Sequence, residues 1–234
     1  MTDHRIVSHE DWTAERVALL AKEKAFTRLR DELSRERRAL SWERVEKSYV
    51  FETPNGSQSL GDLFDGCQQL IVYHFMFSPG WEVGCKSCSF WADNFNGIGA
   101  HLRQRDVTLL AISRAPLSTL QAFAKRMGWA FPWASSGSGD FNFDYHVSFA
   151  PDAVRSGPVS YNYTLREGGP ELPGVSVFYR DEDGTIFHTY SCYARGLDIL
   201  NGAYHYLDLT PTGRDEDELP YPMDWVKLHD LYDR

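Results

Sequence analysis

Two cysteines three residues apart are the residues in this sequence best suited to chemistry. Cys85 and Cys88 lie in the stretch GCKSCSFWAD, which follows the apolar run QLIVYHFMF and the turn residues SPG. The run predicts a strand buried on both faces, and the residues from Cys85 onward predict a helix. The pair would then lie at a helix N-terminus, where unpaired backbone N–H groups favour the thiolate, the reactive form of cysteine.

The spacing of the pair predicts a role for each sulfur. Cys88 would lie one helical turn further in, so that its sulfur could attack a mixed disulfide formed by Cys85. We predict that Cys85 attacks and Cys88 resolves, giving a redox-active disulfide. Lys86 adds a cation beside the pair, and we take it and Trp81 as candidate substrate contacts. The alternative is that both cysteines are simply small buried core residues.

The other two cysteines and the overall composition limit the classes of function. Four cysteines in 234 residues, with Cys67 and Cys192 as the remaining two, are too few for a disulfide scaffold and suggest a reducing cytoplasm. The N-terminus has no apolar signal core, and no apolar stretch is long enough to suggest a membrane span. The net charge of −9 argues against nucleic acid as a partner. We expect Cys67 and Cys192 to be ordinary buried residues.

A zinc site is a second interpretation of the cysteines. His188 and Cys192 have the spacing His-x-x-x-Cys, and with Cys85 and Cys88 they could form a Cys₃His site. The position of the close pair between a strand and a helix favours thiol chemistry instead, so we predict no metal. No glycine loop of the dinucleotide-binding type is present, and we predict no organic cofactor.

The predicted elements alternate between strands and helices. This order predicts an α/β fold whose central sheet, closed by an antiparallel hairpin, is mixed and flanked by helices. The predicted strands cover 49–52, 70–77, 106–113 and the hairpin 175–191; the predicted helices cover 9–47, 85–103, 115–128 and 194–207.

The chain organisation follows from these elements. We predict an N-terminal helical extension over 1–47, a main domain over 48–210 with an aromatic-rich insertion at about 129–170, and a C-terminal tail over 211–234. Phe26, Leu29, Leu33 and Leu40 recur at helical spacing in the extension. That apolar stripe must be buried against the main domain or a second subunit, so a homodimer through this helix is one possibility.

Several segments resemble a known family. A strand, a Cys-x-x-Cys helix and then a proline directly before a strand and hairpin resemble the thioredoxin fold. The resemblance implies that Pro173, in ELPGVSVF, is a cis-proline that faces the cysteines and holds substrate backbone. A larger set of segments resembles the thioredoxin-like bacterial domain-of-unknown-function family 899 over nearly the whole chain: YHFMF, GCKSCSFWAD, SRAPL, MGWAFPW, FNFDY, ELPGVSVF, FHTYSCYARGLD and LDLTPTGR.

The sequence also departs from these relatives. Gly84 stands where thioredoxins have a Trp, and Lys86-Ser87 lacks their proline. The peroxiredoxin pattern needs a threonine three residues before its cysteine, and those positions hold Glu82 and Cys85, which disfavours a peroxidase of the usual type. Thioredoxins place a buried acid on the strand before the pair, so His74 is a possible proton acceptor for the inner thiol, although an ordinary strand histidine is the simpler reading.

The function that the sequence favours is thiol–disulfide exchange. Cys85 and Cys88 would carry the reaction, and a protein or small-molecule thiol or disulfide would be the partner. The alternative is a binding or structural module that keeps the fold without turnover.

Overall fold

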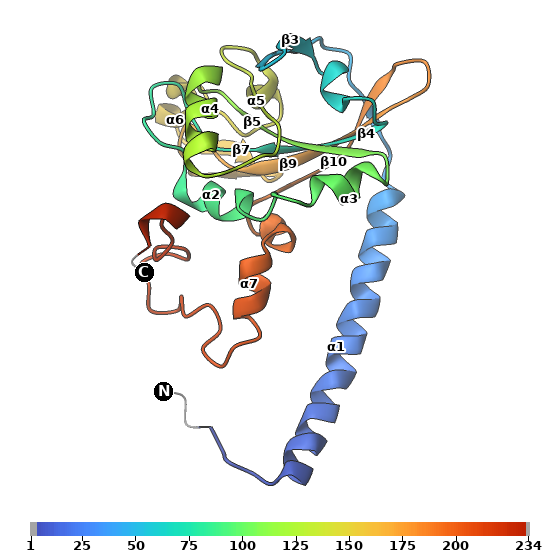
Figure 1. Cartoon of the computed structure of the whole chain (residues 1–234), viewed down its shortest axis with the longest axis vertical. Helices are drawn as coiled ribbons and strands as arrows, with labels where there is room; N and C mark the ends of the chain where they lie inside the picture. Colours follow the sequence, from blue (N-terminus) through green and yellow to red (C-terminus); the bar gives the residue numbers. More distant parts are fainter. Residues whose placement is uncertain (1–3, 233–234) are drawn as a thin grey trace. The chain divides into compact units, whose positions relative to one another are not determined.

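The computed structural model describes residues 4–232 and divides into two units at Ser41 and Trp42. The first unit consists mainly of one unbroken helix, α1 (His9–Arg38) (Figure 1). Ser8 caps it, because its hydroxyl accepts the Asp11 N–H at 3.1 Å. The helix ends before residue 47, the predicted end, because β1 (Glu43–Arg44) pairs with the last strand of the sheet.

The second unit is built on a mixed eight-stranded sheet with the order β1-β10-β9-β4-β5-β6-β2-β3. A separate two-stranded ribbon lies beside it, formed by β7 (Val159–Tyr161) and β8 (Thr164–Arg166). The other strands of the large sheet are β2 (Val50–Thr53), β3 (Gly56–Ser59), β4 (Gln69–His74), β5 (Val107–Ser113), β6 (Trp133–Ser135), β9 (Gly174–Arg180) and β10 (Ile186–Tyr193).

Four central strands define the fold type. β4 and β5 are parallel, β9 is antiparallel to β4, and β10 is antiparallel to β9. α2 (Lys86–Ala92) lies between β4 and β5 in the chain, and α4 (Leu117–Arg126) follows β5. This β-α-β-α-β-β connectivity with the strand order β10-β9-β4-β5 is the thioredoxin arrangement, so the predicted fold class is confirmed.

Some helical predictions differ from the structure. The segment 85–103 is two helices, α2 and α3 (Gly99–Arg103), because the chain turns at Gly97, whose φ of 86° lies in the left-handed region. The segment 194–207 is a 3₁₀ helix, η2 (Ala194–Leu200), followed by α7 (Gly202–Leu207). The remaining short helices are η1 (Asp62–Phe64), α5 (Phe141–Asp144), α6 (Pro151–Ser156) and η3 (His229–Leu231).

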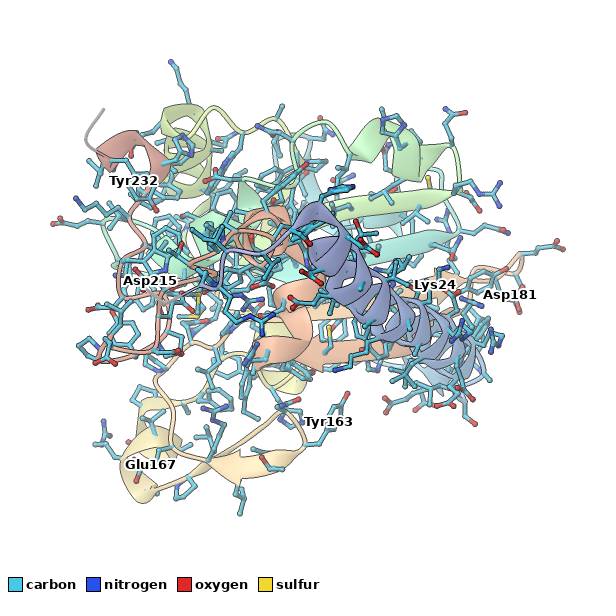
Figure 2. The ribbon with its side chains drawn as sticks, turned by 90° about the horizontal axis from the view of Figure 1, so that it is seen from below. Lys24, Tyr163, Glu167, Asp181, Asp215 and Tyr232 are labelled. Carbon is cyan, nitrogen blue, oxygen red and sulfur yellow. The ribbon has the colours of Figure 1, made fainter. Side chains whose placement is uncertain are left out.

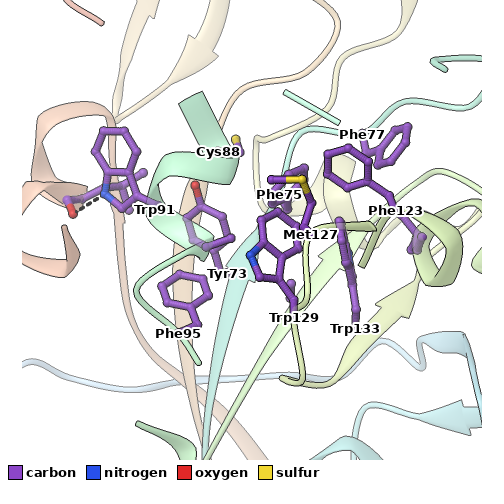
Figure 3. Packing of buried hydrophobic residues seen from close by; sticks show 14 of the residues in the cluster. Tyr73, Phe75, Phe77, Cys88, Trp91, Phe95, Phe123, Met127, Trp129 and Trp133 are labelled. Carbon is purple, nitrogen blue, oxygen red and sulfur yellow. Dashed lines mark hydrogen bonds between the residues drawn. The ribbon is translucent and has the colours of Figure 1, made fainter. Parts of the chain in front are cut away.

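The sheet has a separate apolar cluster on each face. Tyr73 and Phe75 point toward α2 and α4 and pack with Phe123, Trp129 and other aromatic side chains (Figure 3). Leu70, Val72 and Phe178 point to the opposite face. The aromatic-rich segment 129–170 contributes to both faces and adds β6 to the sheet.

The C-terminal tail packs on the cluster around α2. Val226 and Leu228 are buried, and the Trp225 ring meets the Phe90 ring edge-on at 5.5 Å. No helix between residues 4 and 232 combines the length and apolarity needed to cross a membrane.

Candidate thiol–disulfide site

A closed loop carries the chain from β4 to Cys85. Beyond the strand, the Ala115 N–H donates to the Phe77 carbonyl at 2.8 Å and keeps the chain beside β5. The loop then returns, and the Cys85 N–H donates to the Met76 carbonyl at 3.1 Å. Cys85 is thereby fixed as the N-cap of α2, and its carbonyl accepts the first helical hydrogen bond, from Ser89, at 3.0 Å.

Gly84 is needed for the close packing of this loop. A Cβ at this position would lie 2.7 Å from Cε1 of Phe75 and 2.9 Å from Cε1 of Phe123. The two rings meet edge-on in the core, so neither can move aside freely. This packing explains why the residue before Cys85 is glycine and not a large aromatic residue.

Gly84→Ala should therefore lower stability by about 1–3 kcal/mol, because overpacking forces side chains and backbone apart. Urea unfolding followed by tryptophan fluorescence would measure the loss. Gly99→Ala is the matched control, since no atom lies within 4 Å of its added Cβ and alanine is the better helix former. Equal stability of the two variants would contradict this account of the loop.

The surroundings of Cys85 favour its thiolate. The pKa of Cys85 is lowered to about 6, first because the Cys88 thiol donates a hydrogen bond to it, and further because the N–H groups of Cys88 and Ser87 and the Ser87 hydroxyl point at it. Burial opposes this shift in pKa. The residue is nevertheless less completely buried than Cys88.

Cys88 has the opposite character. It is 2% exposed, and burial together with the neighbouring Cys85 raises its pKa well above the usual value. Two groups partly offset the increase in pKa: the Met76 N–H, whose nitrogen lies 3.5 Å from Cys88 Sγ, and the Tyr73 hydroxyl. The Cys85 thiol therefore ionises more readily than an ordinary cysteine, whereas the buried Cys88 thiol ionises less readily.

Tyr73 is the side chain that sequence reasoning missed. It extends from β4 toward α2, with its hydroxyl end directed at the helix that carries Cys88 (Figure 3). The residue is fully buried, and its hydroxyl forms no hydrogen bond of ordinary geometry within the described chain, yet it lies close enough to lower the pKa of the Cys88 thiol. Burial and the nearby Cys88 raise the pKa of Tyr73 itself, so the phenol stays protonated.

The structure does not bring His74 to the cysteines. His74 lies on the opposite face of β4, where its Nε2 is 2.8 Å from Ser176 Oγ. Burial, with a smaller contribution from His188, lowers its pKa to about 3. Adjacent strand residues point to opposite faces, so Tyr73 and not His74 faces Cys88.

Lys86 and Trp81 lie beside the pair but are held by other groups. The Lys86 Nζ donates to the Asp224 carbonyl at 2.9 Å and lies 5.8 Å from the centroid of the Tyr221 ring, so its charge is directed at the C-terminal segment. Trp81 is half-buried in the loop before Cys85, and its backbone N–H donates to the Ser78 carbonyl at 3.1 Å.

The predicted cis bond before Pro173 is wrong, since no peptide bond within residues 4–232 is cis. The trans form is intrinsically favoured even before proline, and here the extended backbone is fixed on both sides. The Leu172 N–H donates to the Val147 carbonyl at 2.8 Å, and the Tyr161 hydroxyl donates to the Pro173 carbonyl at 2.6 Å. Pro173 is half-buried and directly precedes Gly174, which pairs with His74 at the end of β4.

A buried carboxylate joins the Cys85 loop to the Pro173 segment. Glu171 accepts hydrogen bonds from Ser78 at 3.1 Å and from Ser148 at 2.6 Å, and Arg114 lies 3.3 Å away. Burial raises the pKa of Glu171, against the effect of these donors. Ser78 begins the loop that leads to Cys85, so one side chain fixes both segments.

The four residues of the alternative zinc site do not converge. Cys192 shares the sheet face of Tyr73, but His188 lies on the other face with its Nε2 2.7 Å from Ser191 Oγ. Among residues 4–232, no three His, Cys, Asp or Glu side chains come together as metal ligands. None of the four cysteines is disulfide-bonded.

The strand order defines the chain as a thioredoxin-fold protein. Over residues 1–232 the sequence matches the family described as "Bacterial protein of unknown function (DUF899)", and the chain belongs to this family. No curated protein matches the sequence.

Similar solved structures are peroxiredoxins. Peroxidoxin BcpB from Mycobacterium tuberculosis is 13% identical, with a TM-score of 0.46 over 68% of this chain and 92% of that one. Peroxiredoxin Q from Xanthomonas campestris is 15% identical, with a TM-score of 0.43 over 67% and 90%. A yeast mitochondrial 1-Cys peroxiredoxin is 14% identical, with a TM-score of 0.44 over 72% and 78%.

Proposed function

We propose that the protein is a thiol–disulfide oxidoreductase in which Cys85 attacks and Cys88 resolves. The observation that carries the proposal is the difference between the two thiols. Cys85 caps α2, is partly exposed and has a pKa lowered to about 6, whereas Cys88 is buried with a raised pKa. Attack requires a thiolate at neutral pH, and resolution requires a second sulfur that stays protected until the mixed disulfide exists.

The reaction proceeds in two exchanges. The Cys85 thiolate attacks a substrate disulfide, forms a mixed disulfide and expels one substrate sulfur as a thiolate. Cys88 then loses its proton, which passes to a departing sulfur, and attacks Cys85 Sγ. The second substrate sulfur leaves, so the substrate gains two electrons and Cys85 and Cys88 become a disulfide. An external dithiol returns the pair to the reduced state.

Four further residues are proposed to act around the pair. Trp81 lies in the loop that precedes Cys85, and Pro173 lies beside the end of β4; both would contact a substrate chain that reaches Cys85. Lys86 instead fixes the C-terminal segment next to α2 through Asp224. The Tyr73 hydroxyl stabilises Cys88 as it ionises during resolution.

Dithiothreitol-driven reduction of insulin tests the proposal. We expect the wild-type chain to accelerate precipitation of the insulin B chain, and Cys85→Ser to fall to the uncatalysed rate. Cys88→Ser should lose turnover but retain a mixed disulfide with its substrate, released by dithiothreitol. Cys192→Ser is the matched control with the resolving chemistry intact and should retain activity. Equal rates for Cys85→Ser and wild type would contradict the enzymatic function and favour a binding module.

A further inference from the structure

A row of large apolar side chains follows α1 at intervals of seven residues. Seven residues correspond to nearly two helical turns, so the row lies on one face. No residue of α1 is buried. The row consists of Trp12, Leu19, Phe26 and Leu33 on α1 and of Leu40 just beyond its end at Arg38, with exposed fractions of 55%, 51%, 66%, 48% and 51%. A continuous exposed apolar row of this kind marks an interaction surface.

The row is symmetric about its central member. Trp12 and Leu40 lie equally far from Phe26 along the chain, and so do Leu19 and Leu33. If a second copy of α1 is turned end over end about Phe26, Trp12 meets Leu40 and Leu19 meets Leu33. The surface is therefore complementary to itself in the antiparallel orientation, as a two-fold symmetric contact requires.

The charges of α1 favour the same orientation. The half from His9 to Glu23 has four acidic and two basic residues, whereas the half from Lys24 to Arg38 has six basic and three acidic residues. An antiparallel pair places each acidic half beside a basic half, and the two helix dipoles also oppose one another. A parallel pair would place the basic halves together.

We propose that α1 pairs with α1 of a second copy of this chain, as an antiparallel two-helix contact centred on Phe26. The seven-residue repeat is the one that keeps a seam facing its partner. The assembly does not depend on the thiol chemistry of Cys85, so the two proposals stand or fall separately.

Cysteine cross-linking of the full-length chain tests the register. In a Cys85→Ser background, Phe26→Cys should form an interchain disulfide under mild oxidation, because the two copies of residue 26 meet on the two-fold axis. Lys24→Cys is the matched control. Residue 24 precedes residue 26 by two positions, so its side chain lies on the opposite face of the helix (Figure 2). Trp12→Cys should cross-link to Leu40→Cys but not to itself, since antiparallel copies of residue 12 lie ~42 Å apart.

Sedimentation equilibrium provides the second measurement. The wild-type chain should sediment as a dimer, and Phe26→Glu combined with Leu33→Glu should sediment as a monomer with unchanged insulin reduction. A monomeric wild type, an assembly larger than two, equal cross-linking at positions 24 and 26, or self-cross-linking of Trp12→Cys would each overturn the proposal.

Discussion

The rate of Cys85 alkylation in the reduced protein is expected to rise with pH around a midpoint near 6 instead of the ordinary value near 9. Iodoacetamide reacts with the thiolate, so the rate follows the ionised fraction. At pH 7 this fraction is about 90%, against about 1% for an unperturbed thiol, a difference of roughly 100-fold. Mass spectrometry of peptides labelled at a series of pH values would give the midpoint.

The midpoint is a sharper readout than the rate at one pH. A thiolate of low pKa is intrinsically less nucleophilic, so part of the gain in ionised fraction is lost in reactivity. The midpoint of the alkylation rate against pH does not depend on this loss of nucleophilicity. A midpoint near 9, with the chain folded, would contradict the proposed site.

One substitution separates the causes of the shift. The largest of the effects that lower the Cys85 pKa is the hydrogen bond from the Cys88 thiol, followed by the backbone donors at the start of α2. Cys88→Ala removes the thiol hydrogen bond and keeps the backbone donors. The midpoint should therefore rise by about one pH unit or more while staying below that of a free thiol. Cys67→Ala removes a buried cysteine outside both apolar clusters and should leave the midpoint unchanged.

The lowered pKa of Cys85 also affects the direction of electron flow. A lowered pKa in the folded state means that the fold stabilises the Cys85 thiolate, a contribution present above the pKa of the unfolded thiol and lost as pH falls through about 6. Because only the reduced protein contains this thiolate, the same contribution favours the reduced state. Relative to a disulfide whose thiols have ordinary pKa values, it makes the Cys85–Cys88 disulfide more oxidising at neutral pH than at acidic pH.

The sequence was informative about the site where the signals are local. An apolar run, turn residues and a Cys-x-x-Cys determine a strand, a loop and a helix start within some twenty residues, so Cys85 could be placed at an N-cap. The break at Gly97 also had a local signal, the stretch NFNGIG, but the apolar positions at Phe90, Phe95, Ile98 and Leu102 favoured a single long helix over it.

The side-chain neighbours of the pair depend on the fold as a whole. Residues 70–77 are apolar at nearly every position, so alternation could not show which face of β4 meets α2. The right-handed crossover from β4 to β5 sets that choice, and it turns Tyr73 toward Cys88 and His74 away. Likewise, the conformation before Pro173 depends on Val147 and Tyr161, which are distant in sequence and are not implied by any nearby pattern.

Tyr73→Phe is expected to slow resolution without weakening the fold. A buried hydroxyl with no hydrogen bond of good geometry costs about 1–3 kcal/mol, so its removal should leave the melting temperature unchanged or raise it. A hydrogen bond to an ionised group contributes about 1.5–3 kcal/mol, and losing it from the Cys88 thiolate should slow the second exchange by roughly 10- to 100-fold. Stability and rate are thus expected to change in opposite directions.

An aromatic disulfide with a coloured thiolate product resolves the two steps. Attack by Cys85 releases one coloured thiolate, and attack by Cys88 releases the second, so stopped-flow absorbance shows two phases. In Tyr73→Phe the first phase should match wild type, and the second should be slower and shifted to higher pH, because the pKa of Cys88 rises when the hydroxyl is absent.

Two controls assign the effect to the hydroxyl. Tyr204→Phe removes a satisfied hydrogen bond, the one to Glu216 at 2.8 Å, and should lower stability with both phases unchanged. His74→Gln, on the far face of β4, should leave the second phase as it is. A destabilised Tyr73→Phe variant with both phases intact would contradict this role and make the hydroxyl a packing group. The Met76 N–H would then be the group that favours ionisation of Cys88.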